Sequence, residues 1–267
     1  MKNIIKNSFA ILLLCPAITQ AASLTVSSSV VHNGEEVGGL AVDLSMLTVT
    51  GSVGSTSLGT TLSDYVFLSN DAGRSDTQPI VVAPSASGGT RIGDITAAAD
   101  TIAASNGSEN RYSVTIDGVN LVSGAPIAGA TGNDFEAGVM ASDLSGTIDL
   151  SGLASGTIHL IYGTFISAVE VTANLNDGSA DLLSSDLSGG VFGNSSFTGS
   201  SGHVLTSFDF DTSGGFDTFS WSQINADTDG SRGRFSGVVI TDVVLIPEPS
   251  TALLGLFGLA VFARRRR

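Results

Sequence analysis

The sequence predicts an all-β protein, with a β-sandwich or jelly-roll body between an N-terminal signal peptide and a single apolar C-terminal helix. Three observations lead to this prediction. Short segments alternate apolar and polar residues, as in "HVLTSFDFD" and "DTFSWSQ". Clusters of Gly, Ser, Asn and Asp separate these segments, as is typical between strands. Only residues 95–105, "ITAAADTIAAS", give a weak indication of helix.

The strands of the body are expected in a regular succession. Residues 145–162 carry the pattern Ser-Gly-Thr-Ile-x-Leu twice, and Gly152 and Ser155 interrupt the run, which predicts a hairpin. Residues 163–178 are expected to form a strand that ends in the turn sequence Asn-Asp-Gly. Further strands are expected at residues 111–122, 203–211, 217–223 and 234–246. Because no linker rich in Pro and Gly divides the chain, residues 22–245 are predicted to form one domain.

The N-terminus has the order of a secretory signal peptide. Lys2 and Lys6 precede the apolar residues 9–14, and small residues follow at 19–22. The apolar stretch is shorter than the roughly 17–25 residues of a membrane-spanning helix. Residues 1–21 are therefore predicted to be a cleaved leader, with a buried N-terminal helix as the alternative.

Composition limits what the exported body can do. The only cysteine, Cys15, lies in the leader, so the mature chain has no thiol for a disulfide, a metal or a nucleophile. Between the leader and residue 247 the chain keeps five basic and 24 acidic residues, a net charge of −19. Such a body repels nucleic acid and anionic membrane surfaces and attracts cations.

The C-terminus, residues 246–267, has three consecutive parts. Pro247, Glu248 and Pro249 form an extended segment, because proline fixes φ and lacks an N–H. Residues 251–263 are apolar and would span about 20 Å as a helix, against a bilayer core of about 30 Å. Arg264, Arg265, Arg266 and Arg267 close the chain, and a cluster of this kind stays on the cytoplasmic side.

These three parts resemble the PEP-CTERM sorting signal, and the resemblance covers the C-terminal segment alone. It implies export through the secretion machinery, transient insertion into the inner membrane and processing near Pro247–Pro249 by an exosortase-type enzyme. It also implies a final place at the cell surface or in the extracellular polysaccharide matrix of a biofilm. The segment circulates as well under the label of an ice-binding protein C-terminal domain, which implies nothing here about ice. A plain C-terminal membrane anchor is the alternative.

The strongest motif for metal chemistry is "NADTDGSRGRFS". Asn225, Asp227 and Asp229 occupy every second position before Gly230, as in the first half of a calcium-binding loop. The second half does not fit, because Ser236 stands where a bidentate glutamate is required. Carboxylates of neighbouring strands, such as Asp209, Asp211 or Asp217, could complete the site. The alternative is an Asp- and Gly-rich turn without metal, so no cofactor is expected unless calcium binds.

Nothing in the sequence predicts an enzyme. The three histidines, His32, His159 and His203, lie in separate strand-like segments without the spacing of a zinc site, and no Gly-x-Ser-x-Gly motif occurs. Trp221 could stack on a sugar ring, although a single tryptophan in an alternating strand is more often part of the core. The leading interpretation is a non-catalytic exported protein, and the alternative is a carbohydrate-binding module, with or without calcium.

Overall fold

The computed structural model describes much of the body and neither terminal segment. The described residues are 22–33, 40–69, 80–81, 91–93, 95–97, 112–120, 139–141, 143–165, 169–176, 182–183, 201–212, 216–225 and 233–246. The predicted signal peptide and the predicted C-terminal helix lie outside them. Among the described residues, no helix has the length and apolar character needed to cross a bilayer.

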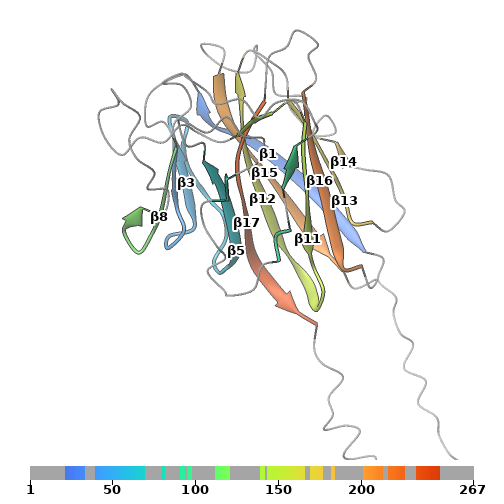
Figure 1. Cartoon of the computed structure of the whole chain (residues 1–267). Helices are drawn as coiled ribbons and strands as arrows, with labels where there is room; N and C mark the ends of the chain where they lie inside the picture. The colour runs from blue at the N-terminus through green and yellow to red at the C-terminus, as the bar shows by residue number, and fades with distance from the viewer. Residues whose placement is uncertain are drawn as a thin grey trace, which may run out of the picture.

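The described strands form three sheets (Figure 1). The central sheet has the order β1-β15-β12-β17-β5-β6, and β10 pairs with β17. Its strands are β1 (Ser23–Asn33), β15 (Ser201–Asp211), β12 (Leu153–Phe165), β17 (Gly233–Leu245), β5 (Leu62–Ser69), β6 (Ile80–Val81) and β10 (Val139–Ala141). All pairs in this sheet are antiparallel.

Two smaller sheets flank the central one. The β13–β16 sheet has the order β14-β13-β16-β11-β7, with strands β14 (Leu182–Leu183), β13 (Val169–Asn174), β16 (Thr218–Asn225), β11 (Asp143–Asp149) and β7 (Thr96–Ala97). The β2–β3 sheet has the order β4-β3-β2-β8-β9, with strands β4 (Gly54–Ser57), β3 (Thr48–Gly51), β2 (Leu40–Asp43), β8 (Tyr112–Ile116) and β9 (Val119–Asn120). Only β2 and β8 pair in parallel among the described strands.

The central sheet is buried on both faces, so the described body has three layers. In β17, Val238 and Ile240 pack in the core shared with the β13–β16 sheet, whereas Val239 packs in the core shared with the β2–β3 sheet. Figure 1 shows the same order of layers from left to right. The all-β prediction is confirmed, and the third layer was not predicted.

The strand sequences reflect these two environments. Every side chain of β17 from Phe235 to Thr241 is buried, because both faces of that strand are covered. Residues 144–150, by contrast, alternate between buried and exposed, because one face of β11 meets solvent. Alternation therefore marks strands with one face in solvent, including β1 at the edge of the central sheet, while continuous burial marks the inner strand β17.

The predicted hairpin over 145–162 is wrong. β11 pairs with β16 and β7, whereas β12 pairs with β15 and β17, so the two strands belong to different sheets. Gly152, with φ of 76°, turns the chain between them. The apolar residues of both strands, among them Ile148 and Ile158, then face one another in a shared core. The turn at Gly152 therefore lets the apolar faces of β11 and β12 bury each other.

The weak indication of helix at residues 95–105 is contradicted at its start. Thr96 and Ala97 form β7, which pairs with Ser145 and Leu144 of β11. Ile95 is buried in the core beside them. Strand pairing and burial outweigh the helix propensity of a few alanines. Residues 98–105 lie outside the described part of the chain.

The start of β1 and the end of β17 lie at the same end of the central sheet. One row of paired residues crosses four strands, from Ser23 to Asp211, Ser155 and Val244. We call this end of the body, from which the chain continues to Ile246, the proximal end. The start of β1, which follows the predicted leader, and the end of β17, which precedes the predicted sorting segment, therefore lie at one end of the body.

Candidate functional site

A polar hollow of about 480 Å³ lies on the outer face of β13 and β16. Its lining residues come from both strands and from the turn after β13: Thr172, Ala173, Asn174, Asn176, Ser220, Trp221 and Ser222. The hollow is largely open to solvent, so it is a shallow surface groove and not an enclosed cavity. We call this hollow the β13–β16 groove.

Strand alternation places the polar side chains of the groove together. Phe219, Trp221 and Gln223 are buried, so the intervening Ser220 and Ser222 face outwards. Across the strand pair, Asn174 stands opposite Ser220 and Thr172 opposite Ser222. The groove is therefore a row of outward hydroxyl and amide groups on two adjacent strands.

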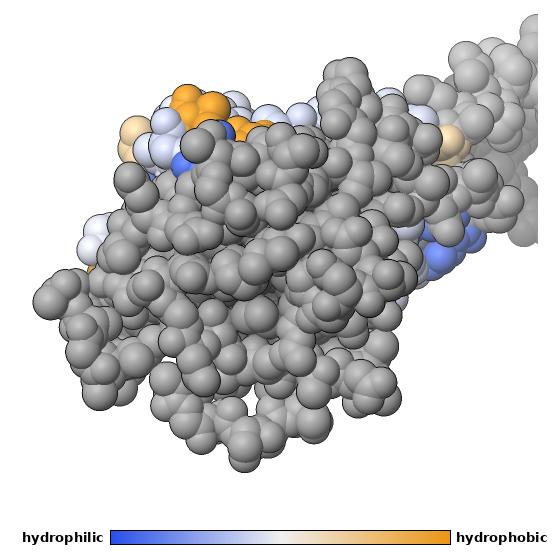
Figure 2. Space-filling view, turned by 90° about the horizontal axis from the view of Figure 1, so that it is seen from above, coloured by the Kyte–Doolittle hydropathy of each residue, from blue (hydrophilic) through white to orange (hydrophobic). Residues whose placement is uncertain are grey.

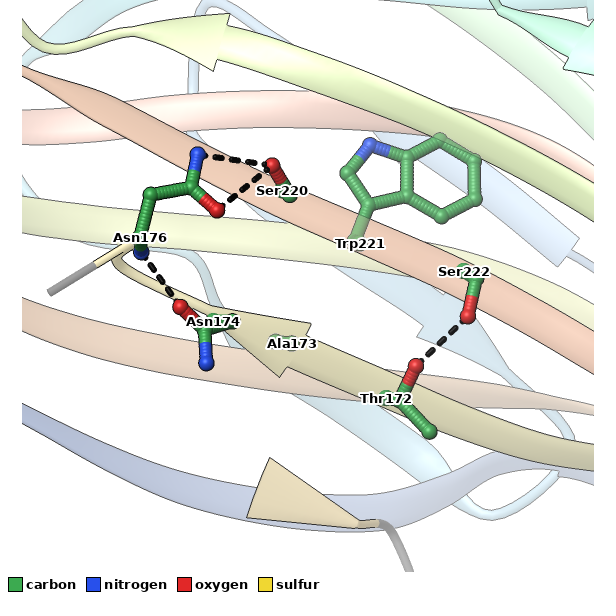
Figure 3. Close-up of a pocket in the computed structure, with 7 residues that line it drawn as sticks. All are labelled: Thr172, Ala173, Asn174, Asn176, Ser220, Trp221 and Ser222. Atoms are coloured by element: carbon green, nitrogen blue, oxygen red, sulfur yellow. Dashed lines mark hydrogen bonds between the residues drawn. The ribbon is translucent and has the colours of Figure 1, made fainter. Parts of the chain in front are cut away.

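Hydrogen bonds order these side chains (Figure 3). The hydroxyls of Thr172 and Ser222 lie 2.5 Å apart. Asn176 donates its Nδ2 to Ser220 Oγ at 3.0 Å, and the backbone N–H of Asn176 donates to Asn174 Oδ1. Asn176 has φ of 57°, a conformation that asparagine tolerates better than most residues. The lining offers both donors and acceptors and no charged side chain among the described residues.

Trp221 contributes to the core and not to a sugar platform. Its side chain is only 3% exposed, and its ring stacks on Phe235 with centroids 4.5 Å apart and planes at 17°. A Cβ at Gly146 of β11 would lie 2.9 Å from the indole Nε1, so the glycine makes room for the ring. Figure 3 shows the indole extending away from Asn174 and Asn176. A ring buried in this way presents no face to a sugar, so the core interpretation of Trp221 is the one that the structure supports.

The structure describes only one of the predicted calcium ligands. Asn225 is the last residue of β16, whereas Asp227 and Asp229 lie outside the described residues. Asp217 precedes β16, whereas Asn225 ends it, so these two residues lie at opposite ends of the same strand. Asp209 and Asp211 are the backbone partners of Thr157 and Ser155, so they lie near the proximal end of the body. Within the described ranges no three His, Cys, Asp or Glu side chains gather as a metal site.

His159 is a structural residue inside the central sheet. Its Nε2 lies 2.6 Å from the carbonyl oxygen of Leu58 and its Nδ1 lies 2.8 Å from Ser207 Oγ. A neutral ring satisfies both contacts when Nε2–H donates to the carbonyl and Nδ1 accepts from the hydroxyl. Burial lowers the pKa of His159 from 6.5 to about 4, against smaller opposing effects of the Leu58 carbonyl, Asp209 and Asp242. His203 is also buried, and the backbone of His32 lies in β1.

Asp242 organises a second feature that sequence reasoning missed. Its carboxylate accepts hydrogen bonds from the backbone N–H groups of Thr60 and Thr61, both at 2.9 Å. It also accepts from their hydroxyls, at 2.7 and 3.1 Å. Burial by itself raises the pKa of this carboxyl, but these hydrogen bonds outweigh it and lower the pKa below its ordinary value. No local pattern indicates the contact, because the partners are more than 180 residues apart.

The described strands end where the predicted sorting segment begins. Ile246 donates its backbone N–H to the carbonyl oxygen of Gly152 at 2.9 Å, and Pro247 follows at once. Pro247, Glu248, Pro249 and the arginines 264–267 lie outside the described residues. The last strand of the β-sheet body thus leads directly into the C-terminal segment.

Fold and terminus together define an all-β protein that carries a C-terminal processing segment. Residues 245–267 match the family model of the PEP-CTERM protein-sorting motif. The chain is therefore an exported protein whose motif implies processing by an exosortase-type enzyme. Comparison with curated proteins finds no match, and comparison with solved structures finds none either.

Proposed function

We propose that this protein is a non-catalytic component of the cell surface or the extracellular polysaccharide matrix. The sorting motif at residues 245–267 carries this proposal, because it directs the body out of the cell. The strongly acidic body supports it, since a net charge of −19 keeps such a domain soluble and apart from nucleic acid. His159 supports it too, because its ring nitrogens are engaged in holding strands together.

Substituting both prolines of the sorting motif is expected to abolish processing. In Pro247→Ala/Pro249→Ala the extended segment loses its fixed φ angles and can continue as strand or helix. Full-length precursor should then accumulate in the membrane fraction, measured by immunoblot and intact mass. The matched control is Pro79→Ala, which alters a proline of the body. Normal release of the double variant would contradict the sorting assignment.

A second function, binding of a neutral glycan, is proposed for the β13–β16 groove. The observation that favours it is the uncharged lining of hydroxyls and amides, which matches the donors and acceptors of sugar hydroxyls. An acidic polysaccharide is disfavoured, because the whole body is strongly negative. The groove has no exposed aromatic side chain in its described lining, so hydrogen bonds would carry the specificity.

Removing polar groups from the groove is expected to weaken glycan binding about tenfold or more. The variant Asn174→Ala/Ser220→Ala loses one amide and one hydroxyl, each worth about 0.5–1.5 kcal/mol. Calorimetry of the purified mature protein with neutral polysaccharides, in calcium and in EDTA, measures the change. Thr50→Ala on the exposed face of β3 is the control. Equal affinities for variant and control would contradict the groove as the site, and loss of affinity in EDTA would point to the Asn225 loop instead.

A further inference from the structure

The last strand of the body changes character at Asp242. From Phe235 to Thr241 every side chain is buried, whereas Val244, Leu245 and Ile246 are 54%, 65% and 46% exposed. Asp242 itself has φ of 53°, in the left-handed region, which breaks the pleat of the strand. We call residues Val243–Ile246 the terminal segment of β17.

The terminal segment adheres to β12 only loosely. Leu245 pairs with Leu153 and Val244 pairs with Ser155, and the register shifts on both sides of the Ser155 pair. Only Val243 packs against the core, and it is partly buried. Among the described residues, the exposed large apolar side chains are Met46, Val53, Val119 and the last three of this segment. In Figure 2 a strongly apolar patch, coloured orange, stands beside hydrophilic described residues at one edge of the view.

The contacts of Asp242 separate this segment from the buried part of the strand. Its N–H donates to the Thr61 carbonyl at 2.9 Å, and its carboxylate accepts from the N–H and hydroxyl groups of Thr60 and Thr61. A Cβ at Gly59, whose φ is +133°, would lie 2.3 Å from Asp242 Oδ2, so the loop fits closely around the carboxylate. We call this set of contacts the Asp242 clamp. Opening of the strand from its end meets few contacts up to the clamp and many beyond it.

We propose that the terminal segment is a detachable strand that leaves β12 to enter the processing enzyme, and that the Asp242 clamp limits the opening. The proposal rests on the sorting function. Ile246 is still hydrogen-bonded to Gly152, and Pro247 is the next residue, so the folded body leaves no spacer before the motif. Proteins that bind an extended segment use its main-chain hydrogen-bonding groups and its alternate side chains, and both are engaged in β12 while the segment stays in the sheet. The exposed apolar side chains of Val244, Leu245 and Ile246 are available for contact with a partner at this segment.

A disulfide between Ser155 and Val244 tests the proposal directly. The two residues are Cα partners across β12 and β17, and the single natural cysteine of the sequence, Cys15, lies in the predicted leader. Val244 also precedes the residues matched by the sorting motif. Oxidised Ser155→Cys/Val244→Cys precursor in membranes containing the processing enzyme is expected to be processed at least tenfold more slowly than wild type. Reduction of the disulfide should restore the wild-type rate.

Two controls separate the outcomes. The single variant Val244→Cys reports the effect of the side chain alone, and the disulfide Thr50→Cys/Ser55→Cys joins a paired, exposed position of β3 and β4, in a different sheet from the segment. Both should be processed at the wild-type rate. Processing of the oxidised Ser155–Val244 variant at the control rate would overturn the detachable strand. Failure to process even the wild type would instead overturn the sorting function.

Hydrogen exchange provides an independent measurement if the disulfide does not form. In the full-length precursor in detergent, the amide of Ile246 is expected to exchange at least 100-fold faster than those of Val238–Ile240. Asp242→Ala should extend fast exchange into the buried part of the strand. Equal protection of Ile246 and Val239 in the wild type would show a strand that does not detach.

Discussion

Trp221→Ala is expected to lower the free energy of unfolding by about 3–5 kcal/mol, as large-to-small core substitutions do. The ring fills the space between Gly146 and Phe235, and no neighbouring side chain can replace its volume. Denaturant unfolding followed by circular dichroism measures the change. Any loss of glycan binding should follow the loss of fold, because the ring lies in the core.

Trp221→Phe is the matched control for this prediction. It keeps an aromatic ring that can stack on Phe235, and it removes the buried indole Nε1, for which no described residue is a hydrogen-bond partner. Its destabilisation should be roughly half that of the alanine variant or less. Wild-type stability of Trp221→Ala with loss of sugar binding would reverse the assignment of Trp221 to the core.

Acidification from about pH 6.5 to pH 4 is expected to remove about 3 kcal/mol of stability through His159 alone. The pKa of His159 is about 4 in the folded protein and 6.5 for the exposed ring. A lowered pKa means that the unfolded chain binds the proton more tightly. The stabilisation is therefore complete above pH 6.5 and is lost as the pH falls towards 4. The measurement is the free energy of unfolding as a function of pH.

His159→Gln isolates this contribution from that of the carboxylates. Glutamine is neutral and can still bond to Leu58 and Ser207, so its stability should vary less between pH 6.5 and 4. Asp242 keeps its own pH dependence in this variant. The hydrogen bonds from Thr60 and Thr61 still hold the pKa of its carboxyl below the ordinary value. Parallel pH profiles for wild type and His159→Gln would show that His159 does not titrate as its burial implies.

Local pattern predicted the strands far better than their arrangement. The alternation in "DTFSWSQ" placed β16 correctly, with Trp221 among its buried residues. The same kind of pattern wrongly joined β11 and β12 into a hairpin, because a turn at Gly152 looks alike whether the strands pair or cross between sheets. Only the competition between apolar faces for a common core decides which occurs.

The candidate sites differ in how far sequence could predict them. The sorting motif is a continuous stretch of sequence, so it could be predicted from the order of Pro247, Glu248 and Pro249 alone. The β13–β16 groove joins Asn174 and Ser220, which come together through strand pairing, and the short residues of either strand alone indicate nothing. The Asp242 clamp likewise joins Asp242 to Thr60 and Thr61, more than 180 residues earlier in the chain.

The sequence by itself indicated the sorting and export of this protein, its single cysteine at position 15 and its all-β class. These properties depend on local order and composition, which do not require a fold to be known. The tertiary structure alone decided that the central sheet is covered on both faces, that the Trp221 ring packs between Gly146 and Phe235, and that β17 loosens at Asp242. Each of these depends on which segments bury one another, and burial is a property of the whole chain.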